Sequence, residues 1–132
     1  MRPIKFREWI EEPEDYDIPS HMASPKFQGD INEVFAQKGD RLGVKYHYMQ
    51  YTGVDDSNGK EIYEGDIVKV TEYGDSYISE VKYYGYKDYP AFDIETPERY
   101  FYSANVISTV KADGRIEVIG NIYENSELLK NN

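Results

Sequence analysis

The fold is decided by residues 65–84, which read GDIVKVTEYGDSYISEVKYY. In the first half of this stretch, Val68 and Val70 alternate with polar residues, and this period of two is typical of a strand with one buried face. A Gly-Asp turn then leads into a second alternating segment. We therefore predict an antiparallel hairpin of residues 67–73 and 77–84.

Other strands and turns are predicted outward from this hairpin. Strands are expected at residues 4–10, 44–52 and 91–95, and turns at residues 55–59 and 64–66. Asp113-Gly114 is a strong signal for a two-residue hairpin turn, because glycine tolerates positive φ. It predicts two further strands, at residues 106–112 and 115–119.

Helices are expected to be short. Asp30 can cap a helix at residues 31–37, and Asn125 can cap one at residues 126–130. A helix as short as the second does not persist alone in water, so Leu128 and Leu129 are expected to be at least partly buried. Residues 11–30 are rich in acidic residues and proline and are expected to form a mobile loop.

The chain has 132 residues, enough for a single domain spanning residues 1–132. Its 14 tyrosines favour strands. We predict a mainly β fold, either a strongly bent sheet or a small, partly open barrel, with one or two short helices. The step from turn to strand at Gly65-Asp66-Ile67-Val68 is similar to that of SH3-like barrels.

The charge balance argues against a nucleic-acid partner. There are 25 acidic against 15 basic residues, for a net charge of −10, whereas a duplex binder needs a basic surface to displace counterions. The chain contains neither a membrane-spanning apolar run nor a signal-peptide pattern. A cytoplasmic protein that contacts no membrane is expected.

No residue pattern marks a catalytic or metal centre. The chain lacks cysteine, and His21 and His47 have no metal-ligand spacing, so neither a metal nor another cofactor is expected. Glu61 and Glu64 could form the carboxylate pair that acid–base chemistry requires. Two nearby carboxylates are, however, expected by chance in so acidic a chain.

Two clusters of aromatic residues, one on each side of residues 91–95, are the most unusual feature. Their tyrosines are Tyr83, Tyr84, Tyr86, Tyr89, Tyr100 and Tyr102. Such side chains can stack on a ligand, form a subunit interface, or pack across strands within the sheet. The sequence leaves these three interpretations open.

Three segments resemble the YopX family of phage and prophage proteins. They are residues 4–9 (IKFREW), residues 49–68 (MQYTGVDDSNGKEIYEGDIV) and residues 117–129 (EVIGNIYENSELL). Family members often have a small residue in place of Glu8 and proline in place of Ser126. The resemblance implies a mainly β protein of phage or prophage origin in a bacterial host, with self-association, and it implies no activity.

The motif residues also have a structural interpretation. Gly59 is expected to supply positive φ in its turn, and Gly65-Asp66 and Gly120-Asn121 to join turns to strands. The motif residues singled out are Gly53, Gly59, Gly65, Asp66, Gly120, Asn121 and Asn125.

Two functions of different classes follow from these observations. The first is a non-catalytic phage accessory protein that acts by binding, as a homo-oligomer with an unknown host or phage protein as partner. The alternative is a small enzyme or nucleotide-sequestering protein that uses Glu61, Glu64 and the tyrosines in a pocket.

Overall fold

The computed structural model describes residues 4–15, 17–23, 43–83, 91–97 and 106–130. Within these ranges the chain is mostly β, with a strongly curved sheet, one short α-helix and one 3-10 helix, which confirms the predicted fold class. The elements are β1 (Phe6–Glu11), β2 (His21–Ala23), β3 (Lys45–Asp55), β4 (Glu61–Tyr63), β5 (Asp66–Glu72), β6 (Asp75–Glu80), β7 (Lys82–Tyr83), β8 (Phe92–Asp93), α2 (Val106–Asp113), β9 (Arg115–Asn121) and the 3-10 helix η1 (Ser126–Leu129).

The chain forms two compact units, Met1–Tyr51 and Thr52–Asn132. β3 contributes residues to both of them. That residues 1–132 behave as one domain stays a prediction. Among the described residues, no helix has the length and hydropathy needed to cross a membrane.

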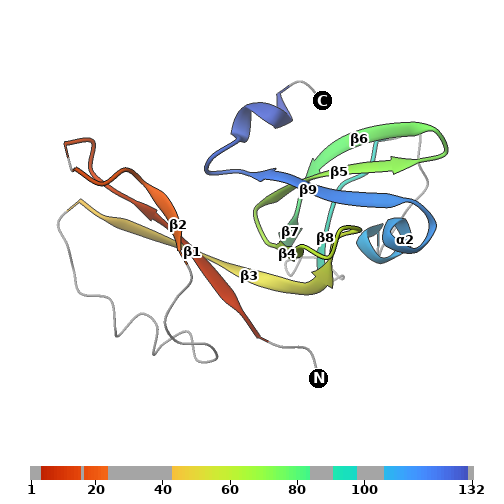
Figure 1. Cartoon of the computed structure of the whole chain (residues 1–132), viewed down its shortest axis with the longest axis horizontal. Coiled ribbons are helices and arrows are strands. Elements are labelled where there is room, and N and C mark those ends of the chain that lie inside the picture. Colours follow the sequence, from red (N-terminus) through yellow and green to blue (C-terminus); the bar gives the residue numbers. More distant parts are fainter. Residues whose placement is uncertain (1–3, 16, 24–42, 84–90, 98–105, 131–132) are drawn as a thin grey trace. The chain divides into compact units, whose positions relative to one another are not determined.

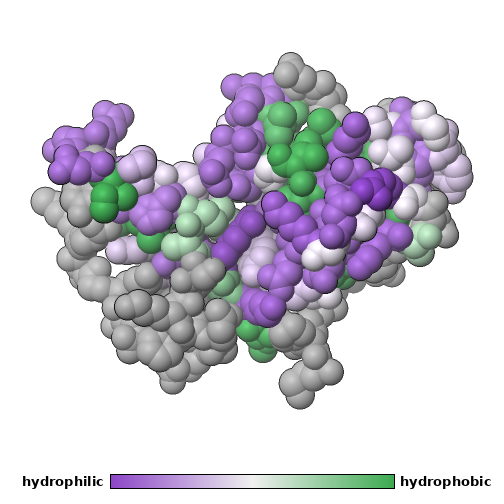
Figure 2. All heavy atoms as spheres, viewed as in Figure 1, coloured by the Kyte–Doolittle hydropathy of each residue, from purple (hydrophilic) through white to green (hydrophobic). Residues whose placement is uncertain are grey.

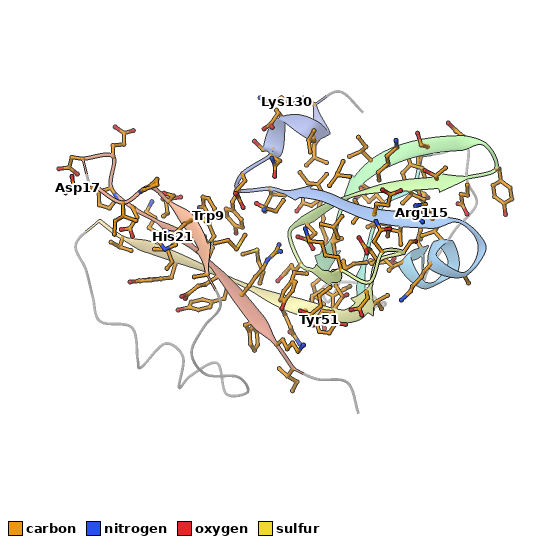
Figure 3. All side chains as sticks on the ribbon, viewed as in Figure 1. Trp9, Asp17, His21, Tyr51, Arg115 and Lys130 are labelled. Carbon is orange, nitrogen blue, oxygen red and sulfur yellow. The ribbon has the colours of Figure 1, made fainter. Side chains whose placement is uncertain are left out.

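The first unit is built on an antiparallel sheet in the order β2-β1-β3 (Figure 1). In the central strand, Glu8 lies opposite Tyr48 of β3 and Ala23 of β2. Trp9, the next residue, is buried. The predicted strands at residues 4–10 and 44–52 are therefore confirmed as β1 and β3.

The expectation of a loop across residues 11–30 is wrong for residues 21–23. The backbone N–H of Glu12 donates to Ser20 Oγ at 2.9 Å and helps to close a turn. The chain then returns along β1 as β2, with Met22 opposite Trp9. This pairing is long-range, so the proline-rich composition of the segment did not reveal it.

The second unit has a three-stranded sheet in the order β6-β5-β9, and its core lies against one face of that sheet. The core contains Ile62, Val68, Val70, Tyr77, Val81, Ile94, Val106, Ile107, Val110 and Ile116. The predicted β5–β6 hairpin is confirmed, with Val70 opposite Tyr77 in a regular register. Its two turn residues, Tyr73 (φ 54) and Gly74 (φ 74), both have positive φ, as a type I′ turn requires.

The predicted hairpin at Asp113-Gly114 is wrong, because residues 106–113 form α2. Val106, Ile107 and Val110 share one helical face and are buried in the core. Gly114 then ends the helix, with its N–H donating to the carbonyl of Val110 at 2.8 Å. The strand β9 follows and pairs with β5 rather than with the preceding segment.

The C-terminal segment forms the 3-10 helix η1, which contacts β6. Leu128 and Leu129 are half-buried, as predicted. The predicted cap is wrong: Asn125 makes no side-chain cap bond to η1, and its Oδ1 instead accepts the N–H of Asn121 at 3.2 Å. The helix predicted at residues 31–37 lies outside the described residues.

Candidate functional site

A pair of aromatic rings lies on the two-stranded ribbon of β7 and β8. Tyr83 and Phe92 are directly opposite in the register. Their ring centroids are 5.0 Å apart and the ring planes are tilted by 59°, a favourable geometry for two aromatic rings. Tyr83 remains 45% exposed. Phe92 is half-buried, so Tyr83 is the ring of this pair that is exposed to solvent.

Asp93 connects the ribbon to the start of α2. This side chain is buried, and its two carboxylate oxygens accept the N–H groups of Val106 and Ile107, each at 3.0 Å. Those two amides belong to the start of α2, where amides lack a partner within the helix. No acidic residue occupies the first turn of α2. Asp93 thus caps the helix and holds β8, and with it Phe92, in place.

The structure tests only part of the predicted tyrosine cluster. Tyr83 is described and exposed, whereas Tyr84, Tyr86, Tyr89, Tyr100 and Tyr102 lie outside the described residues. Phe92, which sequence reasoning did not single out, is the ring that supports Tyr83. Its signal in the sequence was its place in the predicted strand at residues 91–95, where a cross-strand aromatic partner is common.

A second built feature is the turn around Asp56, which sequence reasoning assigned to turn composition alone. Asp56 Oδ1 accepts the N–H groups of Asn58 and Lys60, and Oδ2 accepts that of Val118, all at 2.9 Å. Burial alone would raise the pKa of Asp56, but these three backbone donors and the charge of Lys60 lower it below its ordinary value. The carboxylate thus ties the turn to β9, which is a structural role.

A buried carboxylate and a tyrosine lie together in the first unit. Glu8 is 1% exposed, opposite Tyr48 in the sheet. Burial, and then the charge and hydrogen bonding of Glu8, raise the pKa of Tyr48 to about 12. Sequence reasoning missed this pair, because nothing local shows that Glu8 faces a covered surface.

The remaining candidate residues do not assemble into a catalytic group. Glu61 Oε1 accepts the hydroxyl of Tyr63 at 3.1 Å, and Glu64 lies in the turn before Gly65. The ring of His47 lies 3.6 Å from a carboxylate oxygen of Glu11. Within the part of the chain that the structure describes, no cluster of three or more residues could hold a metal ion.

The motif glycines and asparagines shape turns. Gly53, Gly59 and Gly65 have φ values of 88°, 85° and 86°, in the region that favours glycine. The carboxylate of Asp66 accepts the N–H of Tyr63 at 2.8 Å, which closes the turn before β5.

A similar arrangement follows β9. Asn121 Oδ1 accepts the N–H groups of Tyr123 and Glu124, at 3.0 and 2.9 Å. A Cβ atom at Gly120 would lie 2.5 Å from Asn125 Oδ1, so the residue must lack a side chain.

The fold and these features define a small, mostly β protein built on glycine turns, with an exposed tyrosine on one ribbon. The chain belongs to the YopX protein family, whose family model matches residues 5–130. Its fold is similar to that of protein EF1440 from Enterococcus faecalis, with a TM-score of 0.56 and 24% identity. That match covers 98% of this chain and 99% of the other. No curated protein matches the chain.

Proposed function

We propose that this YopX-family protein is a non-catalytic phage or prophage accessory protein that acts by binding, and that it works as a homo-oligomer in the cytoplasm of a bacterial host. The observation that carries the proposal is the exposed ring of Tyr83 on the β7–β8 ribbon. Support for a phage or prophage origin comes from membership of the YopX family.

The ribbon has the properties of a binding surface rather than of a loose edge. Tyrosine is enriched at interfaces because its ring supplies apolar area and its hydroxyl a polar contact. Phe92 restrains the ring of Tyr83, and Asp93 restrains the backbone beneath it. A side chain that is already ordered loses little conformational entropy when a partner binds.

Sedimentation velocity over a concentration series tests the proposal, comparing the wild type with Tyr83→Ser. The matched control is Lys82→Ser, which removes an exposed side chain from the same strand and leaves the aromatic pair intact. We expect the wild type to associate and Lys82→Ser to behave like it. Tyr83→Ser should associate more weakly and therefore dissociate at a higher protein concentration than the wild type. A wild type that stays monomeric, or a Tyr83→Ser variant that associates normally, would refute the proposal.

A further inference from the structure

The tip of the β5–β6 hairpin carries an unusual residue. Tyr73 is 83% exposed, more than the other exposed large hydrophobic residues of the described chain. It is also the one non-glycine residue with positive φ within the described ranges. Bulky side chains rarely adopt this backbone conformation.

The fold itself gives no reason for a tyrosine at this position. The first central position of a type I′ turn favours asparagine, aspartate or glycine, and a ring that is this exposed contributes little burial. The strands below the turn are paired in regular register up to Glu72 and Asp75, so the ring is held at the end of a firm support. Strain at an exposed position points to a role outside the fold.

We propose that Tyr73 is a contact residue through which the protein binds a second copy of itself; this rests on the proposed function as a homo-oligomer and assigns to it a second contact surface besides the β7–β8 ribbon. The face of the same hairpin that points away from the core carries exposed Lys69, directly opposite half-buried Ile78. A two-fold contact brings the same patch of each copy onto the other. The ring of Tyr73 then lies on Lys69 and Ile78 of the second copy.

The chemistry of the hairpin is self-complementary. A lysine ammonium group over a tyrosine ring is attracted by the electrons of the ring face, and the side chain of Ile78 supplies apolar area beside it. Asp75 is exposed next to Tyr73 and carries the charge opposite to that of Lys69. A single hairpin therefore provides both halves of the contact, even though the net charge of −10 makes two copies repel at long range.

Two substitutions at the tip separate this role from a role in folding. Tyr73→Asn places a preferred residue in the turn and removes the ring. We expect it to weaken the self-association constant by about tenfold or more, as for an aromatic anchor. We also expect this variant to have a higher melting temperature than the wild type when both proteins are monomeric. The measurement needs a concentration at which both are monomeric, because the loss of association would otherwise lower the melting temperature of the variant. Tyr73→Phe, the control, should associate like the wild type.

A charge exchange tests the partner surface. Lys69→Glu should weaken association, and adding Asp75→Lys should recover only the part that comes from the attraction between residues 69 and 75, because a carboxylate at residue 69 cannot replace the cation over the ring. If Tyr73→Asn associates like the wild type in sedimentation velocity, the role of Tyr73 is refuted but the proposed homo-oligomer is not. The same holds if monomeric Tyr73→Asn melts at a lower temperature than the monomeric wild type. A wild type that is monomeric at every concentration would instead show that the proposed homo-oligomer itself is wrong.

Discussion

The carboxylate of Asp56 should be a large single contributor to the stability of the second unit. Asp56→Ala removes the acceptor of three backbone N–H groups, those of Asn58, Lys60 and Val118. A hydrogen bond to a charged group contributes about 1.5–3 kcal/mol. Asn58 and Lys60 are exposed, so water can replace part of the loss, whereas Val118 is only half-exposed. We therefore expect the free energy of unfolding to fall by about 3 kcal/mol in total.

Thermal unfolding followed by circular dichroism measures this loss. For a chain of this size, a decrease of about 3 kcal/mol lowers the melting temperature by about 10 °C. Asp56→Asn keeps one acceptor oxygen but turns an NH2 group toward the N–H of Val118, so we expect an intermediate loss of about 1–2 kcal/mol. Glu95→Ala, which removes an exposed carboxylate from the same unit, is the control and should melt like the wild type.

The pH dependence of this difference provides an independent check. The pKa of Asp56 is lowered in the folded state, so its contribution is fully present above the ordinary value of about 3.9. It is lost as the pH falls through the lower folded pKa. The gap between wild type and Asp56→Ala should therefore be constant near neutral pH and become narrower in acid. An Asp56→Ala variant that melts like the wild type at pH 7 would refute the reasoning.

Three further predictions concern other parts of the chain. Gly114→Ala should destabilise the protein by about 1 kcal/mol or more, measured by urea unfolding, because the added Cβ would lie 2.6 Å from the carbonyl oxygen of Thr71; equal midpoints would contradict this. Deleting residues 126–132 removes two half-buried leucines and should lower the melting temperature or dissociate an oligomer. If the truncated chain melts and sediments like the full chain, the segment does not contribute to stability or assembly. Tyr48 should ionise near pH 12 in an ultraviolet titration, with stability lost as the pH rises from about 10 toward that value; in Tyr48→Phe this late step should be missing.

Much of the fold was predictable from the sequence because its signals are local. The alternation of Val68 and Val70 with polar residues identified β5, and the turn composition before β6 identified the hairpin. Positive φ at Gly59 followed from its place after Asn58 in a turn. In each case the side-chain period or the glycine conformation acts within a few residues, so no distant partner was needed.

The candidate site was predictable only in part. The sequence left the role of Tyr83 open, because the strand that carries its supporting ring, Phe92, is brought opposite it only by the fold. The chemical role of Asp93 was hidden for the same reason, because its two donors lie thirteen and fourteen residues further along the chain.

Tertiary structure decided the segment around Asp113-Gly114, where the local signal pointed to a hairpin. Residues 106–112 contain enough apolar side chains for either a strand or a short buried helix. The helix forms because Asp93 caps its first amides and because Val106 and Val110 both reach the core. The strand β9 pairs with β5, and residues 106–112 do not pair with it.

The burial of Glu8 shows the same division. The sequence by itself placed Glu8 in a strand, and this is correct. Its burial and its partner Tyr48 follow from pairing with a segment about forty residues away. Local periodicity and turn chemistry are encoded in neighbouring residues, whereas the pairing of distant strands and the capping of a helix by another element arise only when the chain has folded around a common core.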